Sequence, residues 1–277
     1  MPILRAIIVI LSVLGVISPH LRGEIRVLAV TTSAGFVPGL PGPGSPATIF
    51  CTGLNIGLGA GIIGLGLPVD VQGITVTYAD SFRAPIYGVA DLGTYQIVNF
   101  QVPWEDHPGP IVLAQGESSV VVPSAVAPWG EFFTDADGFA IAAHAADFSL
   151  VTAASPIQPG EWIVLYASNL GSVNGPPPSG QPASLTALAP LDPGMPVAWN
   201  FEVLMRNPAG DLPLESNFMG LAPGLIGAYQ VNAKMPDALP SGAVQIYLQR
   251  SRFCGFFFVP GCGRGEMMDT STIAKLR

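Results

Sequence analysis

Val98-Asn99-Phe100-Gln101-Val102-Pro103 recurs 133 positions later as Val231-Asn232-Ala233-Lys234-Met235-Pro236, and this repeat governs the predicted architecture of the chain. The same offset carries Gly109 onto Gly242, Ile111 onto Val244 and Ser118 onto Ser251, and just upstream Gly88-Val89-Ala90 corresponds to Gly220-Leu221-Ala222. Two copies predict two domains of similar topology, since a solenoid needs at least about three units. We expect one domain over residues 24–123, a linker over 124–130 and a second domain over 131–277.

Away from the repeat, apolar residues recur with a period of two. Ile74-Thr75-Val76-Thr77-Tyr78 and Val244-Gln245-Ile246-Tyr247-Leu248-Gln249 alternate, which places one face of a strand on a core. Ala47–Cys51 and Trp162–Tyr166 are apolar on both faces and indicate central strands. The 33 glycines and 28 prolines are spread along the chain and supply turns. The pattern predicts an all-β chain of two tandem immunoglobulin-like β-sandwich domains.

The N-terminus has the pattern of an export signal. Arg5 precedes an apolar stretch from Ala6 to Ile17, which is shorter than the roughly 20 residues of a spanning helix. We expect residues 1–23 to be a signal peptide, with an uncleaved anchor as the alternative because residues 18–23 lack a clean cleavage site. The predicted location is secreted, extracellular or on the cell surface, with the periplasm as the alternative compartment.

The charge pattern narrows the choice of partners. The formal net charge is −8, and the 11 basic residues form no cluster along the chain. Phosphate binding needs clustered Lys or Arg, so no nucleic acid is expected as a partner. On the same ground we expect no membrane contact beyond the signal segment.

Several stretches resemble a known family. They are Ser33–Gly39, Ala47–Leu54 and Asn99–Glu105 in the first half, and Ser149–Ala154, Pro159–Ala167 and Gly220–Gly224 in the second. In these the chain is similar to the acidobacterial (Solibacter-type) extracellular C-terminal module, which is related to the immunoglobulin-like fold of plexins and transcription factors (IPT/TIG). The resemblance covers nearly all of the chain after residue 23. It implies a secreted or surface-displayed β-sandwich and no catalytic residues.

Two motifs suggest a ligand without completing its site. Gly59-Ala60-Gly61-Ile62-Ile63-Gly64 has the spacing of a dinucleotide-binding loop, but Gly66 and Pro68 interrupt the helix that should follow. We interpret it as a loop between strands and expect no cofactor. Thr134–Gly138 resembles the start of a calcium loop, but the later ligand positions carry no side-chain oxygen. A β-turn is favoured there over a weak surface calcium site, and no metal ligand is assigned.

No pattern along the chain indicates catalysis. Hydrolysis by a nucleophile needs a base beside it. The three histidines, His20, His107 and His144, lie in no G-x-S-x-G, H-E-x-x-H or paired metal-ligand pattern. We therefore predict no enzyme and no catalytic residues, although a glycosidase needs only two carboxylates.

The three cysteines suit an oxidising compartment. Cys254 and Cys262 flank a short loop that a disulfide would close, whereas Cys51 lies in a predicted central strand and is expected to be a buried thiol. The loop carries Phe256, Phe257 and Phe258, and three consecutive aromatics cannot all face a core. These rings either cover the open end of the second sandwich or form a partner-binding tip.

Two functions are compatible with the sequence. The first is a non-catalytic structural or adhesion module that binds another extracellular protein or copies of itself. The alternative is a polysaccharide-binding module, in which Trp104, Trp129, Trp199 and the Phe256–Phe258 cluster would stack on sugar rings.

Overall fold

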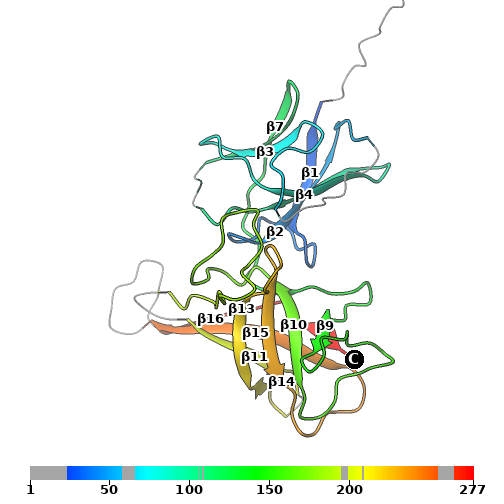
Figure 1. Ribbon diagram of the computed structural model, residues 1–277, viewed down its shortest axis with the longest axis vertical. Coiled ribbons are helices and arrows are strands. Elements are labelled where there is room, and N and C mark those ends of the chain that lie inside the picture. The colour runs from blue at the N-terminus through cyan, green and yellow to red at the C-terminus, as the bar shows by residue number, and fades with distance from the viewer. Residues whose placement is uncertain are drawn as a thin grey trace, which may run out of the picture.

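The computed structural model describes residues 24–57, 66–105, 107, 109–194, 199–207, 209–254 and 265–277. Within these ranges the chain forms strands β1 to β17 and no helix, so the predicted all-β class is confirmed. The strands make four antiparallel sheets, two from each half of the chain, and the two halves are stacked along the long axis of the molecule (Figure 1). The predicted signal peptide, residues 1–23, lies outside the described residues.

The first half contains a four-stranded and a three-stranded sheet. The four-stranded sheet has the order β1 (Arg26–Thr32), β2 (Pro46–Thr52), β5 (Gln96–Gln101), β4 (Ile86–Asp91). The three-stranded sheet has the order β3 (Ile74–Tyr78), β6 (Ile111–Gln115), β7 (Ser118–Val122). Buried side chains of both sheets, among them Ile49, Phe100, Ile74 and Leu113, belong to one apolar cluster. Alternating apolar residues therefore build a single core between residues 25 and 122.

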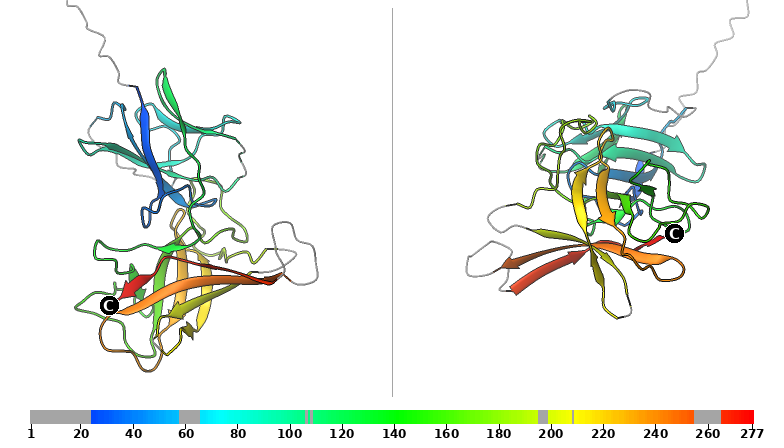
Figure 2. Two further views of the ribbon diagram at one scale, coloured as in Figure 1. Left: turned by 180° about the vertical axis from the view of Figure 1, so that it is seen from behind. Right: turned by 60° about the horizontal axis from the view of Figure 1, so that its bottom comes forward.

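The second half also contains two sheets that share one apolar cluster, which includes Phe132, Leu165, Val203 and Ile246. One sheet has the order β13 (Ser216–Leu221), β14 (Tyr229–Lys234), β10 (Trp162–Ser168), β8 (Glu131–Phe132), with β9 (Ala142–His144) also paired to β10. The other has the order β12 (Leu212–Leu214), β11 (Asn200–Met205), β15 (Val244–Cys254), β16 (Gly265–Thr270), with β17 (Ala274–Leu276) also paired to β15. The hairpin of β15 and β16 extends away from the rest of this half (Figure 2).

The repeat in the sequence is also a repeat of strand pairing. β5 and β14 occupy positions 133 residues apart, and each lies between a central strand and an edge strand. Asn99 pairs with Thr48 on β2, and Asn232 pairs with Val164 on β10, so the two asparagines occupy equivalent places in the ladder. The repeated hexapeptide therefore lies on equivalent strands, β5 in the first half and β14 in the second.

The sequence alignment of the two halves is wrong on either side of this strand. Gly88 pairs with Asn99, whereas Gly220 pairs with Gln230, so Gly220 is equivalent to Ala90 and not to Gly88. Ser118 lies in β7, after a tight turn, but Ser251 lies inside the uninterrupted β15. The turn in the first half uses Gly116 at φ 62°, and the equivalent residue is Gln249, which takes that conformation less readily than glycine. The strand therefore continues in the second half.

The two halves are joined through buried polar groups. Asn169, at φ 59°, accepts a 2.7 Å hydrogen bond from the Gly42 backbone N–H through Oδ1. Its Nδ2 donates to the Pro128 carbonyl at 2.7 Å, and its backbone N–H donates to the Ser45 hydroxyl at 3.1 Å. Asn169 and Ser45 are both buried and out of reach of water. The Asn169 N–H and the Ser45 hydroxyl therefore satisfy each other's hydrogen bonding.

A second set of contacts lies beside Asn169. The Gln101 side chain accepts a 2.6 Å hydrogen bond from the Gly180 backbone N–H and donates to the Gly44 carbonyl at 2.9 Å. The Trp104 ring packs against the core of the second half, and Gly44 lies so close to the ring that a Cβ would be 2.0 Å from it. Both polar pairing and ring packing therefore fix the halves against each other.

Replacement of Asn169 should destabilise the protein. Asn169→Gly keeps the positive φ and removes the side-chain hydrogen bonds, so we expect a loss of about 1–3 kcal/mol in the free energy of unfolding. Asn169→Ala should lose about 1 kcal/mol more, because a Cβ is disfavoured in the left-handed region. Urea unfolding of the wild type and both variants measures this. Two variants as stable as the wild type would contradict the assigned role of Asn169.

Candidate functional site

Three aromatic rings form a row on the four-stranded sheet of the first half. The centroids of Phe36 and Phe50 lie 6.1 Å apart, and those of Phe50 and Tyr95 lie 5.5 Å apart. Phe36 is 59% exposed and Tyr95 is 36% exposed. Phe50 lies on β2 between the core-facing Ile49 and Cys51, so its ring points away from the core. We call Phe36, Phe50 and Tyr95 the aromatic row.

The loop that carries Phe36 is held by the second half of the chain. Phe36 has a φ of 53°, which is unusual for a residue other than glycine. The Thr32 hydroxyl donates a 2.8 Å hydrogen bond to the Glu131 carboxylate and accepts one from the Val37 backbone N–H at 3.0 Å. Glu131 is buried, and this burial raises the pKa of its carboxyl, while hydrogen bonds from Thr32, Gly35 and Ala34 oppose the rise. A side chain from β8 thus fixes the conformation that exposes Phe36.

The tryptophans expected to stack on sugars are engaged within the protein. Trp104 packs at the contact between the halves, as described above. The Arg250 guanidinium lies 4.8 Å from the Trp129 ring and 4.5 Å from the Trp199 ring, and Arg252 lies 4.4 Å from Trp199. Arg250 is also paired with Asp269 at 2.8 Å. Guanidinium groups therefore lie over the Trp129 and Trp199 rings, and a sugar would have to displace them to stack there.

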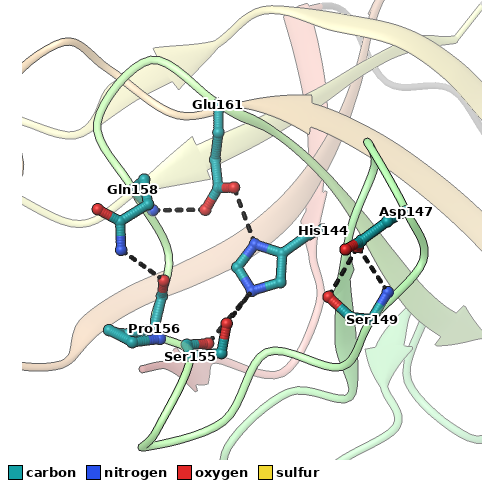
Figure 3. A network of polar contacts seen from close by, with 7 residues as sticks. All are labelled: His144, Asp147, Ser149, Ser155, Pro156, Gln158 and Glu161. Atoms are coloured by element: carbon teal, nitrogen blue, oxygen red, sulfur yellow. Dashed lines mark hydrogen bonds and ion pairs between the residues drawn. The ribbon is translucent and has the colours of Figure 1, made fainter.

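A polar network in the second half joins three side chains that the sequence analysis did not connect. His144 lies at the end of β9, Ser155 on an exposed turn, and Glu161 just before β10 (Figure 3). His144 Nδ1 lies 2.8 Å from Glu161 Oε2, and His144 Nε2 lies 3.1 Å from the Ser155 hydroxyl and 3.2 Å from its carbonyl oxygen. The second oxygen of Glu161 accepts a hydrogen bond from the Gln158 backbone N–H.

Glu161 also shapes the electrostatics of this network. Its hydrogen bond raises the pKa of His144 above the ordinary value, and burial of the imidazole acts against this effect. The Ser155 carbonyl and the nearby Asp147 carboxylate raise it further. Asp147 is itself occupied with Ser149, whose hydroxyl donates to it at 2.7 Å (Figure 3).

Two hollows adjoin the network. One, of about 560 Å³, is lined mainly by apolar residues that include Ala153, Pro156 and Ile157, with Arg277 at its border. The other, of about 480 Å³, is lined by residues that include Glu161, Trp162, Asn217 and Asn232. In the second hollow Asn232 Nδ2 donates to Asn217 Oδ1 at 3.1 Å, so two amide groups lie beside an indole. Outside its lining, Gln230 Nε2 donates to Asn232 Oδ1 at 2.8 Å.

The structure also describes Cys51 and the turn Thr134–Gly138, two features for which the sequence made a prediction. Cys51 is a free thiol buried in β2, as predicted, and burial raises its pKa to about 11. Thr134–Gly138 forms the predicted turn, in which Asp135 Oδ1 accepts hydrogen bonds from the backbone N–H groups of Asp137 and Phe139. The Asp135 carboxylate pairs with Arg277 at 2.6 Å.

Some predictions lie outside the described residues. These are the glycine-rich loop Gly59–Gly64, the tip Phe256, Phe257 and Phe258, Cys262 and the side chain of Cys254, so the proposed disulfide stays a prediction. Among the described residues no group of three or more His, Cys, Asp or Glu could hold a metal ion. In the same part of the chain no helix is long and apolar enough to cross a membrane.

Comparison with known proteins adds no identification. Neither a protein-family model nor a curated protein matches the chain. The resemblance to the Solibacter-type module therefore stays a prediction.

The link between His144 and Glu161 has a measurable consequence. A raised histidine pKa means that the pair stabilises the folded chain at pH values below the ordinary pKa of about 6.5, and that this contribution is lost as pH rises through the folded-state pKa. We expect an NMR titration of His144 to give a pKa above 6.5, and Glu161→Gln to return it toward that value. An unchanged titration in the variant would contradict the assigned hydrogen bond.

Proposed function

We propose that the chain is a secreted or surface-displayed adhesion module of two tandem immunoglobulin-like sandwiches, which binds an extracellular protein through the aromatic row. The observation that carries the proposal is the row itself: Phe36 and Tyr95 are exposed on either side of Phe50, and Phe36 is held there in a left-handed conformation. Strained residues persist where the surrounding structure over-determines them, and they cluster at functional sites. Exposed aromatics are also the residues enriched at protein interfaces.

The geometry of the row favours a protein over a polysaccharide. The planes of Phe36 and Phe50 meet at 62°, and those of Phe50 and Tyr95 at 58°. A sugar chain that stacks on successive rings needs their faces in a common plane. Tilted rings instead form an uneven apolar surface into which side chains of a protein can pack.

Polysaccharide binding is the second candidate, and the hollow beside Trp162 favours it. An indole next to the amides of Asn217 and Asn232 offers one apolar face and several hydrogen-bonding groups to a hydroxyl-rich ligand. This site lies in the second half of the chain, away from the aromatic row. Variants can therefore separate the two functions.

Truncation of the aromatic row tests the proposal. Phe36→Ala with Tyr95→Ala should weaken retention of extracellular proteins by at least about tenfold, since aromatic anchors at interfaces contribute 2 kcal/mol or more. Phe148→Ala is a matched control because Phe148 is 64% exposed, has a φ of 59° and lies in the other half. A quantitative pull-down with surface extracts compares the wild type, the double variant and the Phe148→Ala control. Sedimentation of the same three proteins tests whether the chain binds copies of itself.

The pull-down and a glycan array together distinguish the two candidate functions. Proteins retained by the wild type and by Phe148→Ala, but lost with the double variant, support binding through the row. Equal retention by all three proteins contradicts it. Binding to a glycan array that Trp162→Ala abolishes and the double variant preserves would favour the polysaccharide function instead.

A further inference from the structure

Ser155, His144 and Glu161 have the geometry of a nucleophile, a general base and a carboxylate that orients the base. The base lies within hydrogen-bond reach of the hydroxyl, at 3.1 Å, and the carboxylate holds the opposite ring nitrogen at 2.8 Å (Figure 3). Such constellations are recognised by geometry and not by order in the chain. Here the three residues fall within 18 positions of each other and match no known motif, so no sequence pattern pointed to them.

The hydrogen bonds select the reactive tautomer of His144. With a proton on Nδ1 donated to Glu161, Nε2 keeps its lone pair and accepts from the Ser155 hydroxyl. Once Nε2 is protonated, the Ser155 carbonyl oxygen at 3.2 Å becomes its acceptor. His144 Nε2 therefore has a hydrogen-bond partner on Ser155 in both protonation states: the hydroxyl when the ring is neutral and the carbonyl oxygen when it is an imidazolium.

We propose that Ser155 is a nucleophile that takes an acyl group from activated esters, with His144 as its general base and Glu161 as a positioning residue. The Ser155 oxygen attacks the ester carbonyl while its proton passes to His144 Nε2. The bond to the alcohol breaks, and the alcohol leaves with the proton from Nε2. Water then attacks the acyl-serine, gives a proton to Nε2, and releases the carboxylic acid as the serine recovers its proton.

The surroundings of Ser155 define the substrate class. Its backbone N–H already donates to the Thr152 carbonyl and hydroxyl, and residue 156 is a proline without an N–H. Neither of these two positions therefore offers a free N–H to an oxyanion, so the site suits esters with good leaving groups. The apolar hollow lies next to this turn: Ala153 and Pro156 line it, whereas Ser155 itself does not, and it has room for a short aliphatic acyl chain. This reactivity departs from the expectation of a non-catalytic chain and is independent of the aromatic row.

Covalent labelling tests the proposal directly. The full chain, after incubation with an alkyl fluorophosphonate, should carry the phosphonyl group on Ser155 with loss of fluoride, as shown by peptide mass mapping. Hydrolysis of p-nitrophenyl butyrate should fall by at least about 100-fold in Ser155→Ala and in His144→Gln. Ser149→Ala is the matched control, since Ser149 is an exposed serine bonded to Asp147 without an imidazole.

The pH profile separates a reactive serine from a merely structural one. Hydrolysis should rise with pH as His144 loses its proton, and Glu161→Gln should move the midpoint to lower pH, because Glu161 and Asp147 are the charged groups that raise the His144 pKa. Circular dichroism shows that each variant folds. Label on residues other than Ser155, or activity that survives both Ser155→Ala and His144→Gln in folded protein, overturns the proposal.

Discussion

The hydrogen bonds of Asn169 to Gly42, Ser45 and Pro128 set the orientation of one half of the chain against the other. These groups are largely withdrawn from water, so they are satisfied only when the two halves meet in one arrangement. Apolar contact alone would tolerate sliding, whereas paired donors and acceptors do not. Asparagine suits the position because its side chain both donates and accepts and because it tolerates a positive φ.

Contacts between the halves also fix a loop on the exposed surface of the first half. Glu131 follows the linker directly, and its carboxylate accepts a hydrogen bond from Thr32, the last residue of β1 before the loop. The same loop presents Phe36 above Phe50. The aromatic row therefore belongs to the first half by sequence but depends on the second half for its shape. In this account the two halves are a single binding unit, although each has its own apolar core.

The strands could be predicted from the sequence, but the surfaces could not. Residues 74–78 were expected as a strand and form β3, because alternation of buried and exposed side chains is a local property of the chain. The continuation of β15 beyond Gln249 was missed, since it depends on one glycine that is present in the first half and absent from the second.

The site residues depended on information that a single sequence does not contain. Trp129 and Trp199 are candidates for sugar stacking by residue type alone, but Arg250 packs against both of them from a strand distant in sequence. Phe36 gave no signal because neither its φ nor its exposure follows from its neighbours. His144 and Glu161 were brought together by the pairing of β9 with β10, which local periodicity does not specify.

The contacts of Asn169 and Gln101 imply that the two halves hold one fixed orientation. Spin labels at Ser119→Cys on β7 and Gln245→Cys on β15, two exposed positions on strands of different halves, measure it in a background without the three native cysteines. Double electron–electron resonance should give a single narrow distance distribution in dilute solution. A broad or multimodal distribution would show that the halves move independently, and it would contradict the account.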